Sequence, residues 1–314
     1  MEGLLKEILE IPKAVDTCYR KNKGIKLPEG VFYLGMGASY CAALTLFYCG
    51  KNINPQIASE YYYLSNKTLP LGVLISQSGE TSEIIWAQDY FKRIIAITNN
   101  PSSALGKAKK SQKTINLFAG EENFSSTKTF INTLIVLYLG LGIDPLLGIN
   151  AVEENFDNFK KQTKKQAEEI FKYITFRQVK GLYIIGSGPN IGTAHQGALV
   201  LSELIKFSWT AMSVAQYDHG PKETAENTVV LILNSNGKDK KRIQSIKETL
   251  VKKSNALIIE LAEKKLPEQL TPLTFIVQLD FLMNYLADCM NIKNNFQIGG
   301  KVTKVSDSMK WKPL

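Results

Sequence analysis

Residues 31–37 read Val-Phe-Tyr-Leu-Gly-Met-Gly, and residues 182–188 read Leu-Tyr-Ile-Ile-Gly-Ser-Gly. In each copy an apolar run typical of a strand ends in Gly-x-Gly, and a stretch of helical character follows at 40–47 and at 193–205. Glycine at such a junction permits the tight turn from a strand into a helix. The chain therefore contains an internal repeat, and each copy opens with a strand, a turn and a helix.

Further elements continue this alternation. The strand candidates cover residues 56–58, 71–75, 94–98 and 114–117 in the first copy, and 228–233 and 256–261 in the second, where a helix over 239–252 separates them. Strands that alternate with helices at these lengths predict an α/β fold with parallel sheets covered on both faces.

We therefore expect a tandem repeat of two doubly wound parallel-sheet sandwiches. The lysine-rich stretch 151–165 is predicted to be helical and to mark the boundary. The expected domains are 1–155, which includes an N-terminal helix at about residues 4–21, and 156–290, followed by a C-terminal tail over 291–314.

Residues 76–81, Ser-Gln-Ser-Gly-Glu-Thr, lie between the strand candidate at 71–75 and a predicted helix from Ser82. The N–H groups and partial positive charge at a helix N-terminus attract anions. Gly79 permits the tight turn, and three hydroxyl groups can donate hydrogen bonds. This loop predicts a phosphate-binding site.

The alternative is an ordinary helix start capped by Thr81. One cap does not require Ser76, Gln77 and Ser78 as well, so the phosphate site is favoured. Ser39, at the first Gly-x-Gly turn, can add another hydroxyl to the same phosphate.

Composition limits the other functions. The 314 residues are 44% hydrophobic and 21% charged, as in globular proteins. The net charge of +9 suggests nucleic-acid binding, but the basic residues are dispersed and not interleaved with aromatics, so none is expected. Neither a run of about 18 apolar residues nor a signal-peptide pattern is present, so we expect no membrane span and a cytoplasmic location.

Metal and cofactor signals are also weak. Two histidines and four cysteines (Cys18, Cys41, Cys49 and Cys289) form no CxxC pair or histidine cluster, so we expect no metal and reduced cysteines. Tyr40 stands where a dinucleotide fingerprint needs its third glycine, although Glu60 follows a strand candidate as an acidic ribose ligand would. No cofactor is expected.

Five motifs, in order along nearly the whole chain, resemble those of the sugar isomerase (SIS) family. They are Gly35-x-Gly-Ala-Ser39, the 76–81 loop, residues 121–128 (Glu-Glu-Asn-Phe-Ser-Ser-Thr-Lys), residues 196–203 (Gln-Gly-Ala-Leu-Val-Leu-Ser-Glu) and residues 218–221 (Asp-His-Gly-Pro). The chain is similar to the double-SIS isomerase half of glucosamine-6-phosphate synthase and to related deaminases and deglycases.

The resemblance implies roles for single residues. Glu203 matches the base that moves a proton between C1 and C2, His219 a ring-opening histidine supplied by the neighbouring subunit, and Lys301 a tail lysine that closes over the sugar. Ser126 matches a serine that contacts the sugar. The phosphate is then expected on Ser39, Ser76, Gln77, Ser78 and Thr81, and a homodimer follows if His219 acts in trans.

Glu203, His219 and Ser126 also have structural interpretations, and the adjacent Lys304 is the alternative to Lys301 in the tail. Glu203 could be an exposed helix residue, but its leucine-rich surroundings would make an unpaired carboxylate costly. His219 alone could be a turn histidine, and Ser126 an ordinary loop hydroxyl. His195 is expected to serve packing or to lie on the surface.

The chain departs from the synthase pattern at two positions. Gln196 stands where synthases have a carboxylate, and Val200 stands where they have a lysine that handles the sugar. The sequence also has no glutaminase segment, so glutamine is not expected to supply nitrogen. The tail extends past the usual family ending, and Trp311 has no assigned role.

The expected reaction converts glucosamine 6-phosphate into fructose 6-phosphate and ammonia. The enzymatic alternatives are another hexose-6-phosphate isomerase or a fructosamine-6-phosphate deglycase. A non-catalytic phosphosugar sensor is the remaining alternative, and such a protein could dispense with Glu203 and His219.

Overall fold

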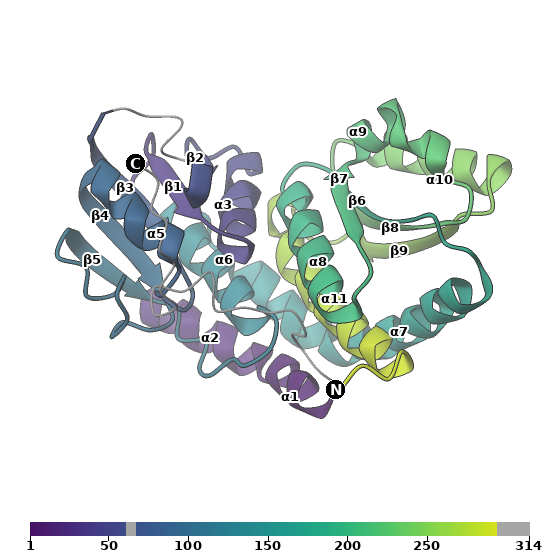
Figure 1. The fold of residues 1–314 in the computed structure, drawn as a ribbon, viewed down its shortest axis with the longest axis horizontal. Coiled ribbons are helices and arrows are strands. Elements are labelled where there is room, and N and C mark those ends of the chain that lie inside the picture. Colours follow the sequence, from purple (N-terminus) through teal and green to yellow (C-terminus); the bar gives the residue numbers. More distant parts are fainter. Residues whose placement is uncertain (61–66, 294–314) are drawn as a thin grey trace. The chain divides into compact units, whose positions relative to one another are not determined.

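The computed structural model describes residues 1–60 and 67–293 (Figure 1). Within these ranges the chain divides into two compact units. The first unit contains residues 13–122 and 128–144, and the second contains residues 1–12, 123–127 and 145–293.

The first unit is built on a five-stranded parallel sheet with the order β2-β1-β3-β4-β5. Its strands are β1 (Phe32–Gly35), β2 (Asn54–Ile57), β3 (Leu69–Ile75), β4 (Phe91–Thr98) and β5 (Ser111–Asn116). Its helices are α2 (Ile11–Asn22, which begins two residues before the unit does), α3 (Ala38–Tyr48), α5 (Ser82–Ala87) and α6 (Lys128–Gly140).

The second unit has a four-stranded parallel sheet with the order β7-β6-β8-β9. Its strands are β6 (Gly181–Gly186), β7 (Trp209–Ser213), β8 (Thr228–Ser235) and β9 (Leu257–Glu263). Its helices are α1 (Glu2–Leu9), α7 (Leu146–Phe176), α8 (Asn190–Ile205), α9 (Val214–His219), α10 (Lys240–Lys253) and α11 (Thr271–Cys289).

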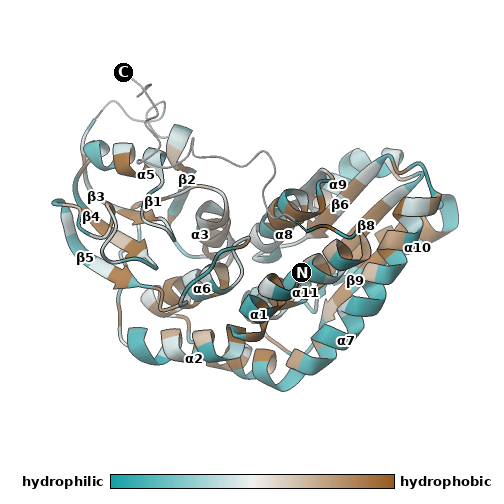
Figure 2. Cartoon of the chain, turned by 60° about the horizontal axis from the view of Figure 1, so that its bottom comes forward, coloured by the Kyte–Doolittle hydropathy of each residue, from teal (hydrophilic) through white to brown (hydrophobic). Residues whose placement is uncertain are grey.

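The predicted α/β class with parallel sheets is confirmed. Every residue of β8 is buried, as expected for a central strand of a parallel sheet covered on both faces. Along β6 the side chains alternate between the faces: Ile185 packs with α9 and α10, whereas Ile184 faces α8 and α11. Figure 2 shows brown, apolar strands and teal, polar surfaces on helices such as α7 and α10.

The N-terminal helix differs from the prediction. One helix was expected at about residues 4–21, but α1 ends at Leu9 and α2 begins at Ile11. Pro12 lacks an N–H group and its ring clashes with the carbonyl four residues earlier, so a continuous helix is interrupted there. The two helices fall in different compact units.

Two further features differ from the sequence pattern. Strand β7 was not predicted because Trp209–Ser213 is a short, mostly half-exposed edge strand without an apolar run. The stretch 151–165 is helical as predicted, but it lies inside the long helix α7, and the main segment of the second unit already begins at Pro145. Residues 123–127 also group with the second unit, although the predicted boundary places them in the first.

Within the described ranges, one helical stretch is long and apolar enough to cross a membrane, residues Glu268–Cys289. Its most apolar 18-residue window is completely buried inside the protein, as expected for a core helix that packs on α7 and α8. The four cysteines are free thiols, and burial raises the pKa of Cys18 and of Cys41 to about 12.

Candidate functional site

The two predicted phosphate-binding segments leave neighbouring strands at the same sheet edge. Strand β1 lies between β2 and β3, and Leu34 pairs with Leu74, so both strands end at the same level. The chain leaves β1 toward β2 on one side and returns to β3 on the other. In open α/β sheets, ligands bind beyond the carboxyl ends of the strands at such a reversal of strand order.

The 76–81 loop forms a compact turn of hydroxyl groups. Ser76 Oγ lies 2.8 Å from Thr81 Oγ1 and accepts a hydrogen bond of 3.0 Å from the Gly79 N–H. Ser78 Oγ accepts from the Glu80 N–H at 3.2 Å. Ser76 is buried, whereas Ser78 is exposed. The loop therefore holds ordered hydroxyl groups both in its buried part and at the protein surface.

The helix-cap alternative for Thr81 is not what the geometry shows. Thr81 occupies the N-cap position of α5 with an extended backbone, but its side chain makes no capping hydrogen bond. Its hydroxyl pairs with Ser76 instead. The local sequence predicted where the helix starts. The partner of the Thr81 hydroxyl depends on the folding of the loop, which brings Ser76 next to it.

The last residue of β4 and the residues that follow it hold this loop in place, and the sequence reasoning missed them. The Thr98 hydroxyl and the Asn99 N–H both donate to the Gln77 carbonyl, at 3.2 and 2.9 Å. The Leu105 N–H donates to the Gly79 carbonyl at 2.9 Å. The signal available in the sequence was the turn-rich stretch 99–103 (Asn-Asn-Pro-Ser-Ser) directly after a predicted strand.

Gly79 is required for two independent reasons. Its φ of +68° lies in the left-handed region, and a Cβ there would lie 1.8 Å from Ser103 Oγ. No other residue type fits without moving the neighbouring loop.

Ser39 lies in the first turn of α3, where it is buried. Gly35 lets the start of this helix pack close to the end of β1, because a Cβ on Gly35 would lie 2.5 Å from the Tyr40 nitrogen. Gly37 has a φ of +48° at the exposed turn. The strand order thus puts Ser39 and the 76–81 loop at one edge, and a shared phosphate remains a prediction.

Glu203 lies near the end of α8 in the second unit and is half-buried. Burial raises the pKa of its carboxyl above the ordinary value, while the Ser125 hydroxyl and the Lys206 ammonium act in the opposite direction. Ser125 Oγ makes no hydrogen bond to another described residue, and its hydroxyl acts on the Glu203 carboxyl from nearby.

Gln196 holds the 123–127 segment against the same helix. Its Nε2 donates to the Ser126 carbonyl at 3.1 Å, and the side chain is fully buried. Gln196, Val200 and Glu203 are spaced so that they share one face of α8, and Val200 is also fully buried. The structure therefore brings Ser125, Ser126 and Glu203 together in one unit, although they are far apart in sequence. An amide donates this hydrogen bond, and an ionised carboxylate at position 196 could not.

His219 is the last residue of α9 and is exposed. A capping box between Ser213 and Gln216 fixes the start of this short helix. Helix α9 packs on the Ile185 side of the sheet, whereas α8, which carries Glu203, lies on the Ile184 side. The structure does not bring His219 to Glu203 within one chain, and its action from a second subunit remains a prediction.

Two expectations fall outside the described residues. Lys301 and Trp311 lie in the range 294–314.

His195 is exposed on α8, as the surface interpretation expects. Across residues 1–60 and 67–293, no cluster of three or more histidine, cysteine or acidic side chains could hold a metal ion.

No family model matches this chain. Its curated relatives include glutamine–fructose-6-phosphate aminotransferases from Sulfurisphaera tokodaii, 30% identical over 256 residues and 74% of this chain, and from Thermococcus kodakarensis, 27% identical over 339 aligned positions and 90% of this chain. The alignments cover 43% and 54% of those proteins, so the chain spans about half the length of the relatives it matches.

Solved structures agree in fold. The C-terminal domain of glucosamine-fructose-6-phosphate aminotransferase from Francisella tularensis superposes with a TM-score of 0.74 at 21% identity, over 94% of this chain and 98% of that one. Glucosamine-6-phosphate deaminase from Thermotoga maritima gives 0.73 at 20% identity, over 93% and 96%. At these identities the likeness establishes the fold.

Proposed function

Because the homologues of this chain are the isomerase (SIS) half of glutamine–fructose-6-phosphate aminotransferase, we propose that it is a phosphosugar enzyme made of two SIS-type units. The reaction we propose is the conversion of glucosamine 6-phosphate and water into fructose 6-phosphate and ammonia. A deaminase of that substrate is among its structural neighbours.

In this proposal the substrate phosphate binds the 76–81 loop, with Ser39 as a further donor. Support comes from the ordered hydroxyl groups at the reversal of strand order and from the left-handed Gly79 turn. Each hydrogen bond to a charged phosphate contributes about 1.5–3 kcal/mol, so a few donors suffice for micromolar to millimolar affinity.

Glu203 carries the proposal. Aldose–ketose chemistry needs a base that removes the proton from C2 and returns it to C1. A carboxyl whose pKa is raised by burial exchanges a proton more readily near neutral pH than an exposed one. The neighbouring Ser126 can contact the sugar because Gln196 holds its backbone against α8.

The remaining steps follow from the chemistry. His219 of a neighbouring subunit opens the ring, and the proton transfer from C2 to C1 leaves an imine at C2. Water adds to that carbon, the C–N bond breaks, and ammonia leaves as the ketone forms. Lys301 is proposed to close the site. These steps consist of proton transfers and hydrolysis, which need neither a metal nor an organic cofactor.

A second candidate is plain isomerisation of another hexose 6-phosphate, or deglycation of a fructosamine 6-phosphate. The buried Val200 favours it, because an apolar side chain on the Glu203 face offers no cation for handling the sugar. A phosphosugar sensor without turnover is the third candidate.

The test is incubation of the purified chain with glucosamine 6-phosphate while ammonia and fructose 6-phosphate are measured together. We expect the two products in equal amounts, and loss of both in Glu203→Gln. Glu248→Gln, an exposed glutamate on α10, is the matched control and should keep full activity.

Other outcomes separate the candidates. Fructose 6-phosphate formed from another hexose phosphate without ammonia would establish an isomerase. Phosphosugar binding without any product would favour the sensor, and equal activity in Glu203→Gln and the wild type would refute the proposed base.

A further inference from the structure

The second unit repeats the strand reversal of the first. Strand β6 lies between β7 and β8, so the chain leaves it to one side and returns on the other. The Gly186-Ser-Gly188 turn follows β6, and Gly188 has a φ of +55°, close to the +48° of Gly37 in the first unit. Ser235 ends β8, much as Ser76 follows β3. An anion would be expected at this edge.

A carboxylate of the protein itself fills this position. A Cβ built on Gly237 would lie 1.7 Å from Glu268 Oε1, and one on Gly188 would lie 3.6 Å from the same atom. Ser235 Oγ donates a hydrogen bond to Glu268 Oε1 at 3.2 Å. The carboxylate is therefore seated against two residues without side chains and receives a hydroxyl hydrogen bond.

The backbone of Glu268 is tied to the start of α8. The Thr271 hydroxyl donates to the Glu268 carbonyl at 2.9 Å, and Asn190 Nδ2 donates to Thr271 Oγ1 at 2.9 Å. Asn190 is the first residue of α8, whose N-terminus favours a negative charge. Ser187, three residues before Asn190 in the chain, is 6% exposed, and its hydroxyl has no hydrogen-bond partner among the described residues.

The corresponding loop of the first unit is arranged differently. Its own acid, Glu80, accepts a hydrogen bond from the Ala104 N–H at 2.9 Å and is thus engaged with the loop after β4. Among residues 1–60 and 67–293, the polar groups described at the β1/β3 edge are hydroxyl groups, and no carboxylate takes the place that Glu268 takes in the second unit.

We propose that Glu268 acts as an internal anion that occupies a second phosphate-type site. The β6/β8 edge is closed to phosphate in the wild-type protein, and removal of the carboxylate opens it to inorganic phosphate or a phosphomonoester. This proposal concerns the second unit alone and does not depend on the reaction catalysed.

The experiment measures binding of inorganic phosphate to the full chain by calorimetric titration. A Ser76→Ala/Thr81→Val background removes the hydroxyl pair of the first loop, so that any binding site there is weakened. In this background we expect no saturable phosphate binding. Adding Glu268→Ala should create one saturable phosphate site per chain, with an apparent affinity about tenfold or more above the weakest affinity that the same titration would detect in the background.

Two further variants distinguish the effect of the volume of the Glu268 side chain from the effect of its negative charge. Glu268→Gln keeps the size of the group and should still exclude phosphate. Glu248→Ala lowers the negative charge equally at an exposed position of α10 and should bind none. The proposal is overturned if folded Glu268→Ala, checked by circular dichroism, binds no more phosphate than its background. It is also overturned if Glu268→Gln binds as well as Glu268→Ala, or if the background with Glu268 intact already binds one phosphate per chain through the second unit.

Discussion

Single side chains set the chemistry of the Glu203 region. Burial raises the pKa of the Glu203 carboxyl, and the nearby Ser125 hydroxyl partly offsets this by favouring the charged form. As the proposed base, Glu203 would work only when deprotonated, so activity should rise with pH through the pKa of Glu203.

Ser125→Ala should move that rise to higher pH. The substitution removes a group that lowers the pKa of Glu203, so a more alkaline solution is needed to ionise the carboxyl. The measurement is kcat/KM for glucosamine 6-phosphate against pH, which reports the free enzyme. Ser245→Ala, at an exposed position of α10, is the control. A Ser125→Ala profile shifted to lower pH would contradict the assignment.

Gly79 and Gly50 form a matched pair for testing the proposed phosphate-binding loop at 76–81. Both have positive φ values, +68° and +83°, but only Gly79 has atoms where a Cβ would lie, whereas the space at Gly50 is open. Gly50→Ala should therefore cost only the backbone strain of about 1–2 kcal/mol. Gly79→Ala should cost more and should also weaken phosphosugar binding.

The measurement is urea unfolding of both variants together with a phosphosugar titration. Equal destabilisation of the two variants, with binding unchanged in Gly79→Ala, would show that the loop geometry is not needed for the phosphate.

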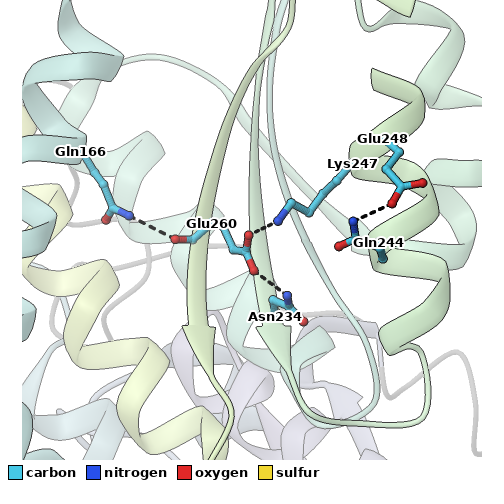
Figure 3. A network of polar contacts seen from close by, with 6 residues as sticks. All are labelled: Gln166, Asn234, Gln244, Lys247, Glu248 and Glu260. Atoms are coloured by element: carbon cyan, nitrogen blue, oxygen red, sulfur yellow. Dashed lines mark hydrogen bonds and ion pairs between the residues drawn. The ribbon is translucent and has the colours of Figure 1, made fainter. Parts of the chain in front are cut away.

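Among the secondary-structure elements, one glutamate of the second unit, Glu260, links strand β9 to β8, α10 and α7 (Figure 3). Glu260 on β9 pairs with Lys247 of α10 and accepts from Asn234 of β8. Gln166 of α7 donates to the Glu260 carbonyl at 3.1 Å. Although burial alone would raise it, the Lys247 and Asn234 hydrogen bonds hold the pKa of Glu260 below its ordinary value.

This lowered pKa predicts acid sensitivity. Folding favours the charged carboxylate, so its stabilisation is present above the ordinary glutamate pKa and is lost as the pH falls through the lower folded value. Glu260→Gln should cost about 1–3 kcal/mol of unfolding free energy at neutral pH. The cost should shrink as the pH falls below about 4.

Urea unfolding at several pH values measures this difference, with the exposed Glu248→Gln as control. A cost for Glu260→Gln that does not change with pH would mean that shape, and not charge, makes Glu260 stabilising.

Element boundaries depended on both local and distant contacts. Pro12 alone explains the break between α1 and α2, so this break was readable from the sequence. In contrast, Gly197 allows α8 to approach both Leu279 of α11 and Ile184 of β6, where its Cβ would lie 2.9 and 3.1 Å away. That close packing involves residues distant in sequence, and no local pattern shows it.

At the scale of the whole molecule, the opposite faces occupied by α8 and α9 lead to a prediction about assembly. If His219 serves the Glu203 of another copy, two inactive variants should complement each other. Mixing Glu203→Gln with His219→Ala and allowing subunits to exchange should restore about a quarter of wild-type activity, because about half of the dimers are mixed and each has one complete site.

The measurement is deaminase activity of the mixture against each variant alone, with subunit exchange verified by mass. Failure to regain activity after proven exchange, or full activity in an isolated monomer, would exclude catalysis in trans.

Local sequence patterns were enough to predict the α/β alternation and the two Gly-x-Gly turns. Their signals are local: apolar runs, helical stretches, and glycines where a helix start approaches the strand end, as at Gly35 and Gly186. The sequence also located the hydroxyl loop at 76–81, because hydroxyl residues and glycine are adjacent in the chain.

The contacts between groups separated by long stretches of chain could not be predicted and became visible in the fold. It placed residues 123–127 in the unit of Glu203, paired the Thr81 hydroxyl with Ser76, and seated Glu268 against Gly188 and Gly237. The physical reason is that strand order and loop packing, and not neighbouring residues, determine which polar groups share a site.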